Sequence, residues 1–309
     1  MVPLDKLKVV AISKKIGSED ILKNVSFSLK EREIKVILGA SGSGKTSILN
    51  SIAGIIRPDS GSIIKDGKDV TDLEIEKRNI GFVFQDLGLF YSMNVAENVA
   101  YGLRIRSRDL HEINDKVAEI SDALSIASHL QKFPSQLSGG EKQLVALART
   151  LITGPDLILM DEPLSSLDSF LRNSMRWYIK DIQKKFGVSI IYVTHDLADA
   201  EILGDSIAIL HEGSILDDGE KDRILNHPKT AETARILGYN LYSTGGRNYA
   251  IHPSMVIVGG PVKVRIVYGE TGIKHNYLIE TEFGKLNVVT DQILNEGDGV
   301  SLERSIQLP

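Results

Sequence analysis

Residues 39–46 combine glycines, a lysine and a hydroxyl at the spacing of a phosphate-binding loop. An apolar, β-branched run precedes them at 34–38, and apolar residues at helical spacing follow at 47–53. Glycines let backbone N–H groups point inward, a helix N-terminus adds its positive dipole end, and a threonine hydroxyl can bind magnesium. The segment predicts a site for a nucleotide triphosphate, and the alternative is a glycine-rich turn that binds nothing. The candidate binding residues are Gly39, Ser41, Gly42, Ser43, Gly44, Lys45, Thr46 and Ser47.

An acid pair, Asp161 and Glu162, follows a second apolar run at 157–160. Doubly wound sheets bind ligands at the carboxyl ends of their strands, so the pair is expected near the phosphate loop. Asp161 can then hold the magnesium bound by Thr46, and Glu162 can polarise a water aimed at the γ-phosphate. A solvated strand end without chemistry is the alternative.

Two further segments fit the same chemistry. Ser138, Gly139 and Gly140 precede a helical segment, so Ser138 can cap that helix while the glycines expose backbone donors to a second anion. Taken alone, this pattern also fits a simple helix cap. His195 directly follows the apolar strand 189–194, where it would lie beside the γ-phosphate and orient Glu162. A lone histidine after a strand is otherwise an ordinary loop residue.

Composition narrows the class of protein. The chain of 309 residues is longer than one typical domain. Its 36 basic and 41 acidic residues give a mild negative balance, and no block of Lys and Arg is present. Nucleic acid is therefore not an expected partner. The absence of cysteine excludes disulfides and thiolate metal sites and agrees with a reducing cytosol. No signal-peptide segment or membrane-spanning run is seen, so a membrane would be reached through other subunits.

Hydrophobic patterning predicts an α/β fold with two additions. Antiparallel strands are expected at 7–12 and 25–29, ahead of the phosphate loop. A helical insert is expected at about 86–155, and a β-rich segment begins near residue 238. Between them the regular α/β alternation resumes, with strands at 157–161, 189–194, 206–210 and 214–217 and a helix at about 168–186.

The order of these motifs resembles the ATPase subunit of an ABC transporter over residues 4–237. The matching segments are the Walker A loop at 39–46, Gln85 as the Q-loop, the signature at 137–141, Walker B ending at 161–162, the D-loop at 167–168 and the His195 switch. Residues 83–90, 161–168 and 251–253 are similar to importer ATPases of the maltose, molybdate, sulfate, iron and polyamine type.

The resemblance implies a P-loop NTPase core with a helical insert and an antiparallel β subdomain, spanning residues 1–237. It also implies a small all-β, OB-like regulatory domain at 238–309. Export, or a soluble ABC ATPase acting on ribosomes or DNA, are alternatives that lack supporting features here, such as fused membrane domains, paired cassettes or basic arms. A regulatory module without hydrolysis is a further alternative, disfavoured by Glu162 and His195.

The resemblance also implies a head-to-tail homodimer that encloses two ATP molecules, each between Walker A of one copy and the Ser138-Gly139-Gly140 turn of the other. Glu162, His195 and Gln85 are then catalytic, Asp168 contributes to the nucleotide site, and Mg²⁺ is held by Thr46, Gln85 and Asp161. The dimer would work at the cytoplasmic face of the membrane, bound to integral permease subunits and indirectly served by a solute-binding protein. The permeases would dock in a groove after Gln85, for which Leu87, Leu89, Phe90 and Met93 are the candidate lining residues.

Some positions depart from the family pattern. Ile16 stands where an aromatic residue usually stacks on adenine, so the adenine contact is expected to be aliphatic. Glu141 and Leu144 replace a common Gln and Arg after the signature turn, and His252-Pro253-Ser254 replaces Arg-Pro-Glu in a tail that is shorter than in sugar importers. The short tail favours an inorganic ion or a polyamine over a sugar as the transported solute.

Overall fold

The computed structural model describes residues 5–106, 109–270, 272 and 274–308. The chain divides into two compact units, Met1–Lys221 and Asp222–Pro309. This division falls before the boundary expected at 237/238, because the two short helices α7 (Lys221–Asn226) and α8 (Ala231–Ile236) lie almost wholly in the second unit. The expected boundary of the functional domain remains a prediction.

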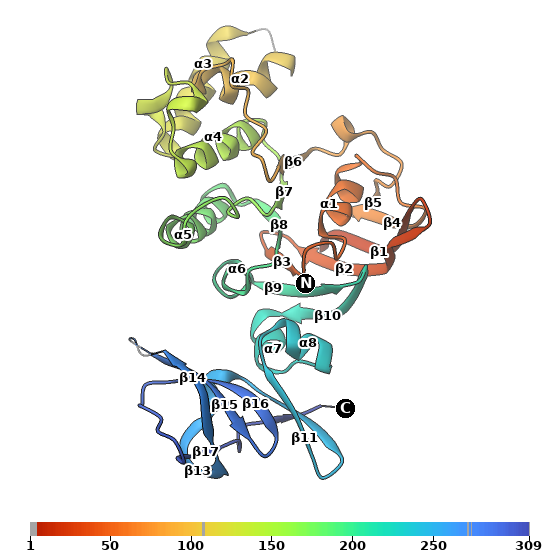
Figure 1. Ribbon diagram of the computed structural model, residues 1–309. Coiled ribbons are helices and arrows are strands. Elements are labelled where there is room, and N and C mark those ends of the chain that lie inside the picture. Colours follow the sequence, from red (N-terminus) through yellow and green to blue (C-terminus); the bar gives the residue numbers. More distant parts are fainter. Residues whose placement is uncertain (1–4, 107–108, 271, 273, 309) are drawn as a thin grey trace. The chain divides into compact units, whose positions relative to one another are not determined.

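A six-stranded sheet forms the centre of the first unit (Figure 1). Five parallel strands lie in the order β9-β3-β8-β7-β6, and β10 pairs antiparallel with β9 at one edge. Every residue of β3, β7 and β8 is buried, as expected for parallel strands covered on both faces. The strands are β3 (Ile34–Leu38), β6 (Ile80–Val83), β7 (Leu157–Asp161), β8 (Ser189–Thr194), β9 (Ser206–His211) and β10 (Ser214–Glu220), and the associated helices are α1 (Lys45–Ala53), α5 (Ser169–Phe186) and α6 (Leu197–Leu203).

A four-stranded antiparallel sheet, in the order β2-β1-β4-β5, accompanies the central sheet. Its apolar side chains share one core with α1 and with strands β3, β7 and β8. The predicted antiparallel pair at 7–12 and 25–29 is thereby confirmed, within longer strands. The strands are β1 (Asp5–Ile16), β2 (Glu19–Lys30), β4 (Ser60–Lys65) and β5 (Lys68–Asp69).

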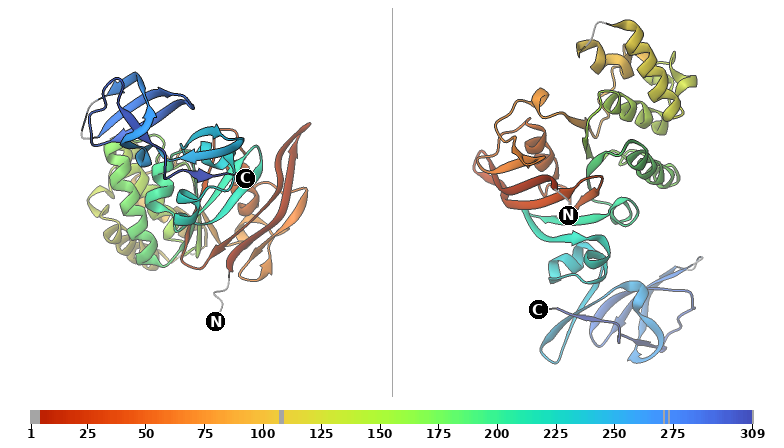
Figure 2. Two further views of the ribbon diagram at one scale, coloured as in Figure 1. Left: turned by 90° about the horizontal axis from the view of Figure 1, so that it is seen from below. Right: turned by 180° about the vertical axis from the view of Figure 1, so that it is seen from behind.

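Helices α2 (Val95–Arg106), α3 (Leu110–Ala123) and α4 (Gly139–Leu151) pack together within the segment expected to be helical. In both views of Figure 2 they lie apart from the antiparallel β2-β1-β4-β5 sheet, as two lobes of the first unit. The apolar positions Ile113, Val117 and Ile120 of α3 are buried, as the predicted helical face requires. Among the described residues, no helix is long and apolar enough to span a membrane.

The second unit is built mainly from short antiparallel strands around its own apolar core, which includes Ile279, Val288 and Val300. Its three small sheets have the orders β11-β12-β18, β13-β17 and β14-β15-β16. The strands are β11 (Asn240–Thr244), β12 (Arg247–Ile251), β13 (Ile257–Lys263), β14 (Arg265–Glu270), β15 (His275–Thr281), β16 (Gly284–Thr290), β17 (Gly299–Ser301) and β18 (Ile306–Gln307). The all-β character predicted for this region is confirmed, and its OB-like regulatory role remains a prediction.

Candidate functional site

The phosphate loop has the backbone that its glycines permit. Gly42 and Gly44 adopt φ values of 80° and 105°, in the left-handed region. A Cβ atom on Gly44 would lie 2.9 Å from the carbonyl oxygen of Ile21, and one on Gly39 would lie 2.5 Å from that of Leu210. Among the described side chains none caps α1, so its first N–H groups remain suited to an anion.

Lys45, the first residue of α1, is only 5% exposed. Its ammonium donates to the carbonyl oxygens of Gly39 and Ala40, each at 3.0 Å, and lies 3.1 Å from Oε1 of Glu162. Three acceptors therefore surround one buried cation, which stands between the loop and the predicted catalytic carboxylate.

Asp161 and Thr46 lie together, as the magnesium prediction requires. The Thr46 hydroxyl donates to Oδ1 of Asp161 at 3.2 Å. Burial raises the pKa of Asp161 above its usual value and the charge of Glu162 adds to this effect, against the opposing influence of Thr46 and Lys45. Gln85 and Asp161 line one open hollow of about 690 Å³, at the ends of the neighbouring strands β6 and β7. A hydroxyl, a carboxylate and an amide oxygen suit Mg²⁺, which prefers hard oxygen ligands.

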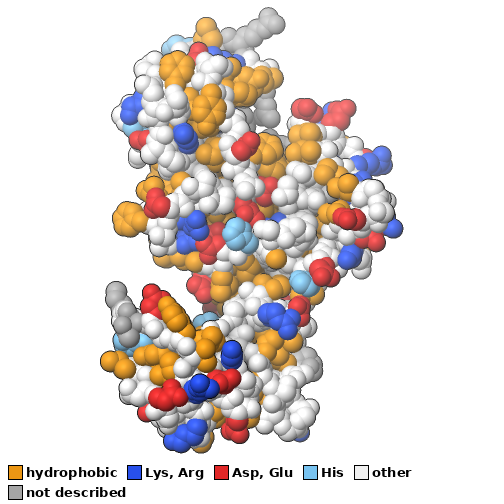
Figure 3. Space-filling model, in the orientation of Figure 1, with side chains coloured by type: hydrophobic (Ala, Val, Ile, Leu, Met, Phe, Trp, Pro, Cys, Tyr) orange, Lys and Arg blue, Asp and Glu red, His pale blue; other side chains and the backbone are white. Residues whose placement is uncertain are grey.

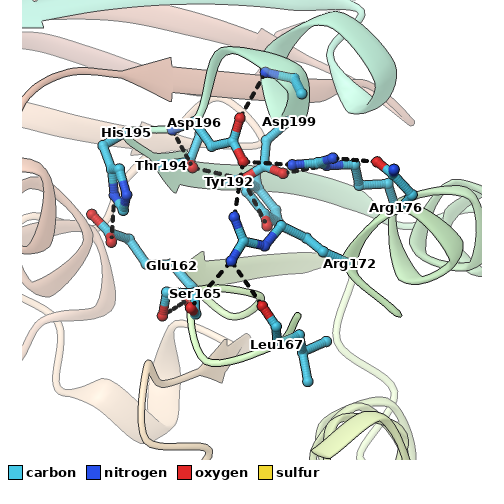
Figure 4. Close-up of polar contacts among 12 residues, drawn as sticks. Glu162, Ser165, Leu167, Arg172, Arg176, Tyr192, Thr194, His195, Asp196 and Asp199 are labelled. Carbon is cyan, nitrogen blue, oxygen red and sulfur yellow. Dashed lines mark hydrogen bonds and ion pairs between the residues drawn. The ribbon is translucent and has the colours of Figure 1, made fainter. Parts of the chain in front are cut away.

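Glu162 and His195 are in direct contact (Figure 4). Oε2 of Glu162 lies 2.8 Å from Nδ1 of His195, and the tautomer decides which group donates. The Glu162 backbone has φ of 41°, an unusual conformation for a non-glycine residue, and its N–H donates to the Val193 carbonyl at 3.1 Å. The Glu162 side chain is 13% exposed and that of His195 is 51% exposed, so a largely buried carboxylate meets a solvent-accessible imidazole.

Sequence reasoning missed a set of charged residues behind this pair. Arg176, which is 4% exposed, donates to Asp199 and Asp196, each at 2.6 Å, and Arg172 lies 3.2 Å from Asp196. Burial opposes the charged form of Asp196, but the N–H of Ala198 and the two arginines outweigh it and hold its pKa below the usual value. The available signal was the four-residue spacing of the arginines, which places both on one face of α5.

The signature turn begins α4 with a capping box. The N–H of Glu141 donates to the Ser138 hydroxyl at 3.3 Å, and the Ser138 N–H donates to Glu141 Oε2 at 2.6 Å. The hydrogen bond from the Ser138 N–H to the Glu141 carboxylate is the main cause that lowers the pKa of Glu141. The carboxylate also lies 3.2 Å from Nε2 of His129, so the departure at position 141 reinforces the cap.

The remaining predicted residues lie outside the phosphate-loop cluster. Within the described part of the chain, no hydrogen bond or ion pair joins the Ser138-Gly139-Gly140 turn to residues 39–46. Asp168 caps α5 by accepting from the N–H groups of Phe170 and Leu171, each at 3.0 Å. Ile16 ends β1 and is 54% exposed, so it is accessible to a ligand.

Comparison with known proteins gives a consistent family. The ABC transporter family profile matches residues 22–165. The molybdate/tungstate import ATP-binding protein of Methanocaldococcus jannaschii is 42% identical, over 96% of this chain and 97% of its own length. The spermidine/putrescine import ATP-binding protein of Protochlamydia amoebophila is 37% identical, over 94% of this chain and 73% of its own length. An iron(III) import ATP-binding protein of Vibrio cholerae is 38% identical, over 74% of this chain and 65% of its own length.

Solved structures agree with the sequence comparison. CbiO1 of Clostridium perfringens, part of an ABC transporter complex, is 28% identical with a TM-score of 0.67, over 75% of this chain and 93% of that one. The ATP-binding cassette MJ0796, a dimer in a post-hydrolysis state with ADP and Pi, is 31% identical with a TM-score of 0.62, over 70% of this chain and 98% of that one. The chain belongs to the ABC transporter family and is an ATPase subunit that energises solute import.

Proposed function

We propose that two copies of this chain bind two ATP molecules head to tail and that their closing and reopening drives import. Each nucleotide would lie between Lys45 of one copy and the Ser138-Gly139-Gly140 turn of the other. The proposal is supported by the separation of this turn from the phosphate loop within one chain, and by the dimeric state of the relative bound to ADP and Pi. Asp168 would approach the nucleotide from the same partner side, and Ile16 would contact the adenine.

The observation that best supports hydrolysis is the position of Glu162, in contact with both Lys45 and His195. Lys45 would bind the β- and γ-phosphates, and Glu162 would polarise a water for in-line attack on the γ-phosphate. His195 would orient Glu162 and donate to the γ-phosphate oxygens. Thr46, Asp161 and Gln85 would hold Mg²⁺, which supplies charge neutralisation for the phosphates when bound.

The proposed permease contact is a groove of about 350 Å³ at the base of the helical insert. Phe90 lines it as expected, together with Phe84, Tyr101 and Arg149, which the sequence prediction did not name. Leu87 and Leu89 are buried, and neither they nor Met93 line it. Figure 3 shows hydrophobic side chains gathered over helices α2–α4 on one face. A coupling segment of a membrane subunit would insert an apolar side chain here, placing the ATPase at the cytoplasmic face.

We propose a tetrahedral oxyanion, molybdate or tungstate, as the solute delivered by a separate solute-binding protein. The relative named for these anions matches this chain over almost the whole of both lengths, including the second unit. The iron(III) relative covers a smaller share of both chains.

The hydrolysis proposal is tested with Glu162→Gln, which keeps the size of the side chain and removes the base. The variant should bind ATP with Mg²⁺, hydrolyse it about 10²-fold or more slowly, and elute as a dimer in size exclusion. Lys45→Ala should lose ATP binding or turnover, and it should remain monomeric where ATP binding is lost. Hydrolysis at the wild-type rate in the glutamine variant, or a strictly monomeric ATP complex, would contradict the proposal.

The solute proposal is tested in vesicles that contain this chain with the permease and solute-binding proteins that copurify with it. Molybdate or tungstate should stimulate ATP hydrolysis and accumulate inside, whereas spermidine and iron(III) should do neither. Stimulation by spermidine alone would overturn the assignment of the solute while leaving the ATPase mechanism intact.

A further inference from the structure

We propose that Arg172 is a positioning residue for ATP hydrolysis, because its guanidinium joins the turn after Glu162 to the turn that contains His195. The inference rests on the proposed roles of Glu162 and His195. In the described structure no hydrogen bond or ion pair joins Arg172 to either of them, and it acts by fixing the two backbone segments on which these side chains stand (Figure 4).

On one side, Arg172 contacts the His195 turn. Its Nη1 lies 3.2 Å from Oδ2 of Asp196, the residue after the histidine. The other carboxylate oxygen of Asp196 accepts from the Ala198 N–H at 2.9 Å, and the Asp196 N–H donates to the Thr194 hydroxyl at 3.0 Å. The Asp196 carboxylate therefore ties Arg172 to the backbone after His195, and the Asp196 N–H ties the same turn back to Thr194.

On the other side, Arg172 contacts the turn that follows Glu162. Its Nη2 donates to the carbonyl oxygen of Leu167 at 2.8 Å and lies 3.4 Å from that of Ser165. The Ser165 hydroxyl and N–H in turn donate to the Glu162 carbonyl at 2.8 Å and 3.1 Å. One planar cation thus spans the two turns whose side chains meet in the 2.8 Å contact between Glu162 and His195.

The neighbouring Arg176 has a different part in the same network. It is 4% exposed and anchors Asp196 and Asp199 to helix α5, but no hydrogen bond or ion pair joins it to residues 162–167 in the described structure. The Arg172 side chain is 28% exposed. Its loss leaves the Arg176 ion pairs in place, so the fold is expected to survive while the two turns become independent. Lysine has a single ammonium and cannot reproduce the fork that reaches both turns.

The test compares Arg172→Met and Arg172→Lys with wild type in the full-length chain. Arg172→Met should lower kcat about tenfold or more while the KM for ATP stays within about twofold, because a small misplacement of catalytic groups slows the chemical step. The kcat of Arg172→Lys should fall between the kcat values of wild type and Arg172→Met. The matched control is Lys180→Met, since Lys180 also lies on α5 and donates to a backbone carbonyl, that of Ile202 at 3.0 Å, away from His195. The control should keep wild-type kcat.

A second measurement reads the histidine directly without hydrolysis. The ring Cε1–H resonance of His195, assigned by its loss in His195→Gln, should shift in Arg172→Met and stay unchanged in Lys180→Met. An unmoved resonance, an unchanged kcat, or an equal loss of kcat in the control would overturn the inference. Failure of the proposed function is distinguishable, because it would appear as unimpaired hydrolysis in Glu162→Gln whatever Arg172 does.

Discussion

At the scale of single residues, the proposed magnesium ligand Asp161 shows how a buried carboxylate is kept at a cost in stability. Its pKa is raised in the folded protein, chiefly by burial, so the folded state binds a proton more tightly than the unfolded state. The stability contributed by this group therefore falls as the pH rises through the raised pKa. At neutral pH the charged carboxylate is destabilising until a cation neutralises it.

Asp161→Asn should therefore raise the unfolding free energy at pH 7 by about 1 kcal/mol, as is common when a functional site is relieved of a buried charge, and should abolish ATP hydrolysis. The gain should shrink as the pH falls through the raised pKa, because the wild-type carboxyl then becomes neutral as well. Urea unfolding at several pH values, with an ATPase assay, measures both effects. A variant that is less stable than wild type at pH 7 would show that the charged Asp161 carboxylate does not destabilise the folded protein.

The residues found from sequence are those that form contiguous motifs. The loop from Gly39 to Thr46 and the pair Asp161–Glu162 could be predicted, because in each case the required residue types directly follow an apolar run that forms a strand. The role of Arg172 could not, because its partner Asp196 lies 24 positions away and the spacing of Arg172 and Arg176 indicates a shared helix face but no particular partner. The contact of Arg149 with the carbonyl oxygens of Leu87 and Gly88, more than 60 positions apart, was missed for the same reason.

At the scale of elements, helix α4 combines two roles at its N-terminus, a structural cap and the proposed contact with the partner's nucleotide. These roles can be separated at Ser138. Aspartate is as good an N-cap as serine, whereas alanine costs about 1 kcal/mol. A carboxylate facing the γ-phosphate of a partner-bound ATP would be repelled.

Ser138→Asp should keep the stability of wild type within about 0.5 kcal/mol but prevent the ATP-dependent dimer in a Glu162→Gln background. Ser138→Ala is the matched comparison, because it removes the cap without adding charge. Denaturant unfolding and size exclusion with ATP measure the two properties. A normal dimer with aspartate at this position would mean that the turn serves only as a helix cap.

Elements were predictable in proportion to their burial. The fully buried strands β3, β7 and β8 matched the expected runs closely, because parallel strands covered on both faces are continuously apolar. The insert was recognised as helical only as a block, since its connections include the short 3₁₀ turns Ala127–His129 and Pro134–Gln136, which have no strong periodicity.

At the scale of the whole molecule, the sequence pattern and the structure divide the chain at different positions. Sequence places the boundary at 237/238, where the β-rich pattern begins, and compactness places it at 221/222. Helices α7 and α8 lie almost wholly between these two positions, and Ile224, Ala234 and Leu237, in or directly after them, are almost fully buried. In the second unit, the Tyr239 hydroxyl donates to the Leu225 carbonyl at 2.7 Å, which ties α7 to the chain just before β11.

If the helices belong with the β-strands, fragment 222–309 should unfold cooperatively, and fragment 238–309 should be at least about 3 kcal/mol less stable or unfolded. Each buried aliphatic side chain contributes about 1.5–3 kcal/mol, and so small a β-unit has little stability to lose. Fragment 1–221 contains every predicted hydrolysis residue and should hydrolyse ATP, with fragment 1–237 as its comparison. Thermal unfolding and phosphate release measure these outcomes. A stable fragment 238–309, together with an aggregated fragment 1–221, would place the helices in the ATPase domain as the sequence pattern predicts.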